Sequence, residues 1–162
     1  MDKILNLSAF GDVINAEKTP ISNNNSPNHS EKTSVGFGKI FSRILQNSSQ
    51  AKLLHWQSKM YGQHKALDKL FDGIIDLGDN LAESIMGKYG RPVLSDRELC
   101  LNLMNFKQPD TGDLTEFMDH LTNCYSKECR EFFDPIKDSE IINILDELLS
   151  LIDKTKYLLT LR

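Results

Sequence analysis

The stretch HWQSKMYGQHKALDKLFDGIIDLGDNLAE, from His55 to Glu83, decides the fold of this chain. Its apolar residues recur every three to four positions, which predicts one amphipathic helix over residues 63–88. One side of that helix would pack in a core, and the opposite side is strongly acidic. The predicted buried stripe comprises Leu67, Leu70, Phe71, Ile74, Leu77, Leu81 and Ile85.

Three further segments show the same helical spacing. Residues 35–59 form the first, with a polar weak point at residues 46–50. Asp113 and Glu116 fit a capping box, which predicts that another helix begins there. Asp138 is expected to cap the last helix, after Pro135 has ended the preceding one. The helix that follows Asp113 would bury Leu114, Phe117, Leu121, Cys124, Tyr125 and Phe132 on one side.

The links between these helices predict their connectivity. Tyr61-Gly62 would end or kink the first helix. Gly87 and Gly90 would close the second, and Pro92 would follow as a stop. Residues 90–112 form a long connection that has room for one short helix, whereas the other two links are short. Short links join antiparallel neighbours, and a long link is a crossover. The sequence therefore predicts an all-α, ferritin-like four-helix bundle over residues 35–162.

Composition excludes several classes of function. The 162 residues carry a formal net charge of −4, whereas a general nucleic-acid binder needs clustered Lys and Arg. Cys100, Cys124 and Cys129 form no CxxC pair and indicate reduced, mostly buried thiols in an intracellular (cytoplasmic) protein. No apolar run approaches the roughly 20 residues that span a bilayer, and the first residues do not resemble a signal peptide.

Residues 1–34 differ in composition from the rest. Residues 15–34 are rich in Asn and Ser, and the whole segment has one more acidic than basic residue, so we expect it to be disordered in free solution. Two interpretations remain open. The segment is either a dispensable tail, or its apolar residues 4–14 dock onto a partner protein while the remainder acts as a tether.

The central helix carries a candidate metal site. His64 and Asp68 lie one turn apart, and so do Asp79 and Glu83, but His64 and Glu83 are separated by about 28 Å along the helix. The two pairs are placed symmetrically about Gly73-Ile74. A second copy crossing antiparallel near Gly73 would bring each pair level with the other, giving two identical sites suited to Fe(II). The alternative is a solvated acidic face, because Asp72 and Asp76 lie on the same side.

Residues 53–83, LLHWQSKMYGQHKALDKLFDGIIDLGDNLAE, resemble the signature of the Dps-like miniferritins: LHW, then HxxxDxxF, then DxxxE. The resemblance extends more weakly over residues 36–161. It implies an iron-oxidising di-iron site between two-fold-related subunits of a hollow shell. The implied ligands and their neighbour are His55, His64 and Asp68 from one chain, Asp79 and Glu83 from the next, and Trp56 beside the site.

The chain also departs from that family. The spacing from His55 to His64 is shorter than usual, which shortens the first loop and leaves the direction of His55 open. The acidic N-terminal segment differs from the basic tails of relatives that bind DNA, so DNA protection is the weakest reading. Two functions stay open: an iron-oxidising miniferritin, or a non-enzymatic assembly protein, such as a phage particle component anchored through its N-terminal peptide.

Overall fold

A computed structural model of the chain describes residues 29–92, 94, 100–105 and 111–161. The described part contains four α-helices and no strand. These helices are α1 (His29–Gln57), α2 (Tyr61–Tyr89), α3 (Thr111–Asn123) and α4 (Ser139–Thr160). A π-helical turn, η2 (Cys124–Glu128), and a 3-10 turn, η3 (Arg130–Phe132), follow α3. The docking peptide predicted at residues 4–14 lies outside the described residues. None of the described helices is both long and apolar enough to cross a membrane.

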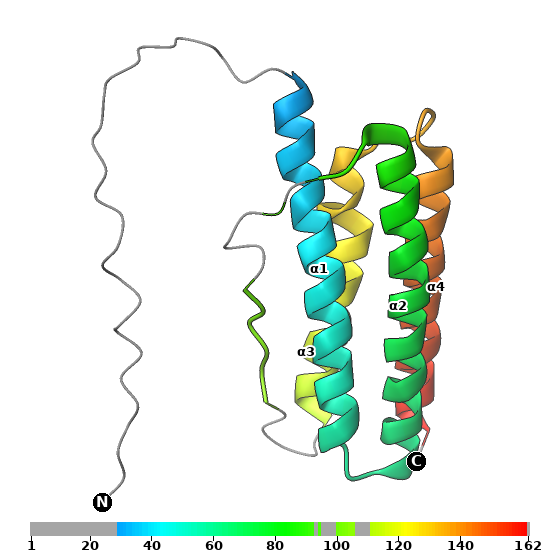
Figure 1. Cartoon of the computed structure of the whole chain (residues 1–162). Coiled ribbons are helices and arrows are strands. Elements are labelled where there is room, and N and C mark those ends of the chain that lie inside the picture. Colours follow the sequence, from blue (N-terminus) through cyan, green and yellow to red (C-terminus); the bar gives the residue numbers. More distant parts are fainter. Residues whose placement is uncertain (1–28, 93, 95–99, 106–110, 162) are drawn as a thin grey trace, which may run out of the picture.

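The four helices form a bundle with the predicted connectivity (Figure 1). Helices α1 and α2 make one antiparallel hairpin, and α3 and α4 make the other. Helices α2 and α3 run in the same direction, so the connection between them must span the length of the bundle. One long crossover between two antiparallel pairs is the ferritin-like arrangement, and the predicted fold class is therefore confirmed.

The predicted stripe of α2 forms the centre of the core. Leu67, Leu70, Ile74, Leu81 and Ile85 are fully buried, while Phe71 and Leu77 pack at the edge of the cluster. Each buried Leu or Ile contributes about 1.5–3 kcal/mol relative to an exposed side chain. Burial of this stripe fixes which side of α2 is left to face outward, and that outward side carries the candidate site.

The helix boundaries differ from the prediction at three places. Helix α1 begins six residues earlier than expected and ends at Gln57, so Tyr61-Gly62 opens α2 instead of ending α1. Met60 adopts an extended conformation at the start of α2, which separates the two helices without a glycine. Gly90 ends α2 with φ of 85°, as predicted, whereas Gly87 lies inside the helix.

The third helix is shorter than predicted and ends irregularly. It begins at Thr111, so Asp113 lies in the first turn and not at the capping position. The π turn then inserts extra backbone and rotates the residues that follow. As a result Phe132, which was expected in the core, is 38% exposed, whereas Phe133 is 6% exposed and takes its place.

Polar residues 46–50 do not weaken α1, contrary to the prediction, because they bind other parts of the molecule. The buried Gln50 amide donates to the backbone oxygen of Met104 at 2.8 Å and accepts from the Met104 N–H at 2.7 Å. Gln46 donates to the backbone oxygen of Asn102 at 3.2 Å. These bonds hold the crossover against α1. Residues 100–105 lack regular structure, and the rest of the short helix expected in the crossover lies outside the described residues.

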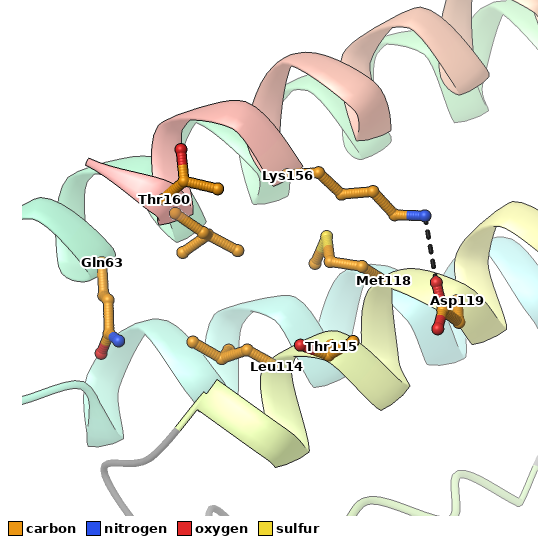
Figure 2. Close-up of a pocket in the computed structure, with 8 residues that line it drawn as sticks. Gln63, Leu114, Thr115, Met118, Asp119, Lys156 and Thr160 are labelled. Atoms are coloured by element: carbon orange, nitrogen blue, oxygen red, sulfur yellow. Dashed lines mark hydrogen bonds and ion pairs between the residues drawn. The ribbon is translucent and has the colours of Figure 1, made fainter.

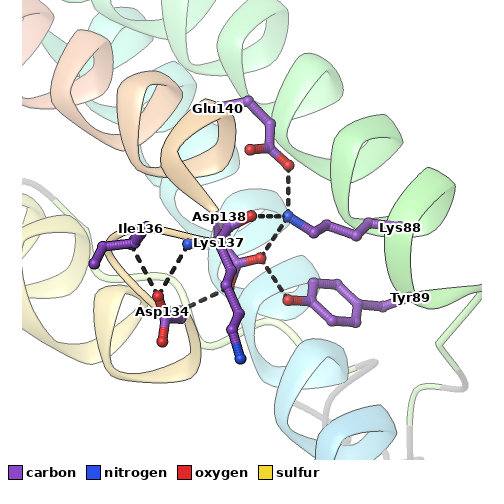
Figure 3. Close-up of polar contacts among 7 residues, drawn as sticks. All are labelled: Lys88, Tyr89, Asp134, Ile136, Lys137, Asp138 and Glu140. Atoms are coloured by element: carbon purple, nitrogen blue, oxygen red, sulfur yellow. Dashed lines mark hydrogen bonds and ion pairs between the residues drawn. The ribbon is translucent and has the colours of Figure 1, made fainter.

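Asp138 joins the end of α2 to the start of α4 (Figure 3). It occupies the predicted capping position, but its side chain does not cap α4. The buried carboxylate instead accepts hydrogen bonds from Lys88 Nζ at 2.7 Å, Tyr89 Oη at 2.5 Å and the Asp134 N–H at 2.8 Å. Burial raises the pKa of Asp138, but these donors outweigh burial and leave its pKa below the ordinary value. The same carboxylate raises the pKa of Lys88.

Candidate functional site

Two histidines face each other across the turn between α1 and α2. His55 lies in the last turn of α1, and His64 lies in the first turn of α2. Their rings stack with centroids 3.9 Å apart and an interplanar angle of 27°. Only residues 58–60 link the two helices, and this short link places the two rings against one another. His55 is 7% exposed, so the shortened loop directs it toward His64 and not into solvent.

Each imidazole is oriented by the backbone of the opposite helix. His55 Nδ1 lies 3.0 Å from the carbonyl oxygen of His64, and His64 Nδ1 lies 3.0 Å from the carbonyl oxygen of His55. A carbonyl only accepts, so both Nδ1 atoms carry the proton. When a ring with this hydrogen bond is neutral, its Nε2 atom keeps its lone pair. A backbone carbonyl that orients Nδ1–H is the usual outer partner of a histidine that binds metal through Nε2.

Asp68 lies beside the histidine pair, and so does a lysine. One Asp68 carboxylate oxygen is 3.5 Å from His55 Nε2 and 3.5 Å from Lys52 Nζ. The Lys52 ammonium also lies 4.3 Å from the centre of the Phe71 ring. Lys52 therefore supplies positive charge to the same oxygen that a metal ion would use. Lys52 was not among the predicted site residues, although it precedes His55 by three residues and so occupies the same face of α1.

The other two predicted ligands lie far from this group. Asp79 and Glu83 are exposed on the second half of α2, and the spacing along the helix keeps them about 20–30 Å from His64. Within the described residues of one chain, no group of three or more His, Cys, Asp or Glu side chains is arranged to hold a metal ion. One chain thus unites His55, His64 and Asp68 as neighbours, but does not bring Asp79 and Glu83 to them.

Ile75, and not Gly73, faces outward on the side that carries the proposed ligands. A Cβ atom on Gly73 would lie 2.5 Å from Leu151 Cδ2, so this glycine allows α2 to approach α4 of the same chain. Ile75 lies about 20° from His64 around the helix axis, inside the arc of roughly 100° formed by the four residues. Its side chain is 42% exposed. Any antiparallel contact at this height would therefore be made by Ile75 and its exposed neighbours.

Apolar residues continue from Ile75 into a groove between α1 and α2. The groove has a volume of about 770 Å³ and contains Asp79 on its wall. Its apolar residues include the exposed Leu45 on α1 and Met86 on α2. Trp56 is 68% exposed at the end of α1, so it does not pack beside the histidines within one chain. The outward side of the α1–α2 hairpin thus combines carboxylates with apolar surface.

A second hollow lies at the other side of the bundle, between α2, α3 and α4 (Figure 2). Its volume is about 470 Å³, and its wall is mainly apolar. Lys156 and Asp119 form an ion pair of 3.1 Å at one edge, and Gln63 lies at the opposite edge. None of the five predicted site residues lines this hollow.

Comparison with known proteins gives one match. The model of a family of unknown function, DUF5856, matches residues 55–159, which begin at His55 and include α2, α3 and α4. No curated protein and no solved structure matches the chain. The match covers more than half of the 162 residues. The chain therefore belongs to the DUF5856 family, whose function is unknown.

Proposed function

We propose that this protein is a Dps-like, ferritin-like homo-oligomer that binds Fe(II) as its substrate between two antiparallel copies, oxidises it and stores the product. His55, His64 and Asp68 of one copy would hold the ion together with Asp79 and Glu83 of the other. The observation that carries the proposal is the pair of reciprocal Nδ1–H bonds to backbone carbonyls. When the rings are neutral, these bonds leave both Nε2 lone pairs for a ligand without any change of ring orientation.

The outward side of α2 supports the requirement for a second copy. Asp72 and Ile75 lie at equal distances before and after the midpoint of the ligand pairs, so an axis there would set Ile75 of each copy beside Asp72 of the other. Exposed apolar surface at Ile75 and Leu45 favours burial in such a contact. The mixture of nitrogen and carboxylate ligands suits Fe(II) and similar divalent ions.

The first test separates metal binding from folding. In His64→Asn the amide nitrogen replaces Nδ1 as the donor to the His55 carbonyl, but no group replaces Nε2. We expect this variant to fold with modestly reduced stability and to lose anaerobic Fe(II) binding. Asp76→Asn, an acidic residue of the same helix outside the set, is the matched control and should bind as wild type does. Equal binding by wild type and His64→Asn would refute the proposed ligand set.

The second test asks whether each site is shared between copies. His64→Asn damages one half of the site, and Glu83→Ala damages the other half. Each variant alone should lack iron binding. After subunit exchange in an equal mixture, mixed dimers keep one intact site, so capacity should return to about a quarter of wild type. No recovery in a mixture proven by mass spectrometry to contain mixed dimers would exclude a shared site.

Oxidation needs its own measurement. Fe(II) is added without oxygen, peroxide or oxygen follows, and the absorbance of ferric oxide is recorded. The Asp68→Ala, Glu83→Ala double variant should oxidise iron no faster than buffer does. If wild type and the double variant oxidise iron at the same rate, the enzymatic part of the proposal is refuted. The binding part is judged separately by the first two tests.

A second candidate is a bundle kept for assembly, with no metal chemistry. The contact between Lys52 and Asp68 favours it, because an ammonium already neutralises the carboxylate. Such a component would dock onto a larger particle, such as a phage particle, through its N-terminal peptide. Deleting residues 1–28 leaves α1 whole and separates the candidates. An iron-storing shell should still assemble and oxidise iron, whereas an anchored component should lose its partner.

A further inference from the structure

Two cysteines meet in the core at the irregular end of α3. Cys124 Sγ and Cys129 Sγ are 3.8 Å apart, and both side chains are buried. Residues five apart on an α-helix point about 140° away from each other. Here the Cys129 N–H bonds to the Cys124 carbonyl at 2.9 Å, which is the wider π-type turn. The π turn therefore brings the two thiols onto the same side of the backbone.

A buried amide is directed at this thiol pair. Asn47 Nδ2 lies 3.6 Å from Cys124 Sγ and 3.2 Å from Tyr125 Oη. His120 Nε2 lies 3.2 Å from Asn47 Oδ1, which fixes the amide so that its NH₂ group faces the sulfur. Burial lowers the pKa of His120, which favours its neutral form. The Asn47 amide thus donates a hydrogen bond to the Cys124 sulfur.

The two thiols are not equivalent. The contact with the Cys129 sulfur lowers the pKa of the Cys124 thiol, burial opposes this effect, and the hydrogen bond from the Asn47 amide adds to it. The pKa of Cys129 is raised by the same thiol–thiol bond and by burial. Because the Asn47 amide donates to the Cys124 sulfur, Cys124 is the better nucleophile of the pair, and Cys129 is placed to react with it afterwards.

We propose that Cys124 and Cys129 form a redox-active dithiol that a hydroperoxide converts to an internal disulfide. With hydrogen peroxide, the Cys124 thiolate attacks one oxygen, the O–O bond breaks, and water leaves, giving a sulfenic acid. The Cys129 sulfur then attacks the Cys124 sulfur, a second water leaves, and the S–S bond forms. Two thiols lose two electrons and two protons, and one peroxide becomes two waters.

Access for the oxidant comes from the same irregular backbone. The chain passes from α3 through a π turn and a 3-10 turn to extended residues within ten positions. Short irregular turns have poorer hydrogen-bond geometry than an α-helix and open locally at lower free energy. Bond formation requires the sulfurs to move from 3.8 Å to about 2.05 Å, a shift that side-chain rotation and this turn can supply.

The test uses the full chain with Cys100→Ser, which removes the exposed cysteine and leaves the pair as the only thiols. The folded protein is treated with hydrogen peroxide, unfolded, alkylated and weighed. We expect a mass loss of two hydrogens, no alkylation, and full recovery of both thiols after a dithiol reductant. The proposal is overturned if both thiols still alkylate under conditions that oxidise Cys100 in wild type, or if the mass gains oxygen and no disulfide forms.

Two single variants in the same background test the order of reaction. Cys129→Ser keeps a hydrogen-bonding group beside Cys124 but removes the second sulfur, so dimedone should trap a sulfenic acid at Cys124. Cys124→Ala should give several-fold less trapping at Cys129. Circular dichroism checks that each variant folds. If either variant does not fold, the peroxide experiment on the Cys100→Ser protein remains the test. Equal trapping at both positions would contradict the assignment of Cys124 as the attacking thiol. None of these outcomes depends on metal binding.

Discussion

Replacing Gly78 by alanine tests how closely α1 and α2 pack beside the candidate site. A Cβ atom on Gly78 would lie 2.5 Å from Ile44 Cγ2, whereas normal contacts begin near 3.4 Å. Ile44 is buried and β-branched, so it has little freedom to move away. Overpacking of this kind costs about 1–3 kcal/mol, and the better helix propensity of alanine returns roughly 0.5–1 kcal/mol. We expect a net loss of about 1–2 kcal/mol of unfolding free energy.

Gly87→Ala is the matched control on the same helix. No atom lies within 4 Å of the Cβ position, so only the propensity gain remains and the variant should be slightly more stable than wild type. Urea unfolding followed by helical circular dichroism measures both, at one fixed protein concentration. In an Ile44→Ala background, where Cγ2 is absent, Gly78→Ala should become stabilising. A Gly78→Ala variant as stable as Gly87→Ala would refute the close approach of α1 and α2.

Three further substitutions have expected outcomes. Asp138→Asn should lower stability at neutral pH. Because the folded pKa of this carboxylate is depressed, its contribution is complete above the unfolded pKa and is lost as pH falls through the folded pKa, so wild type and variant should begin to converge in thermal unfolding only below about pH 4. Gln50→Ala removes both bonds to Met104 and should increase amide hydrogen exchange in the crossover, with little change in α2. Lys52→Met removes the ammonium from Asp68 and should strengthen Fe(II) binding severalfold in calorimetry; weaker binding would contradict the competition between cations.

The bundle was predictable because it depends on local features of the sequence: the periodic spacing of apolar residues and the residues that end helices. The stripe from Leu67 to Ile85 repeats with the helical period, and its burial follows from that spacing alone. Gly90 ended the helix because only glycine adopts positive φ without strain. The one long connection then determined which helices run parallel. These features depend on near neighbours in sequence, and they were read correctly.

The errors arose where a side chain binds something distant. Residues 46–50 look like a weak point in a helix, but Asn47 and Gln50 bind residues more than fifty positions away. The π turn at Cys124 has no composition signal, because it reflects the polar and thiol packing around it. Because of this turn, Phe133 is buried in the core at the place where Phe132 was predicted. Tertiary contacts override local periodicity at these places.

For the candidate site, the sequence specified the residues but not the contacts that decide their chemistry. Spacing and family resemblance selected the five ligands, and the structure places three of them together. Spacing could not reveal that His55 and His64 hold each other through their backbones. The spacing also did not reveal that Lys52 contacts Asp68. Both facts depend on the geometry of a three-residue link between two helices.

These two contacts act in opposite directions on the proposed iron chemistry. The histidines need no reorganisation, because their Nδ1–H bonds already leave Nε2 available, and such preorganisation favours binding. Asp68 must exchange the Lys52 ammonium for a metal ion, and that exchange reduces affinity. In the proposed dimer, the second copy would change this balance by adding two carboxylates, Asp79 and Glu83, which would repel one another without a cation and attract a divalent ion more strongly than a single ammonium. Metal affinity and dimer formation should therefore strengthen each other, so that Fe(II) binding tightens as protein concentration rises.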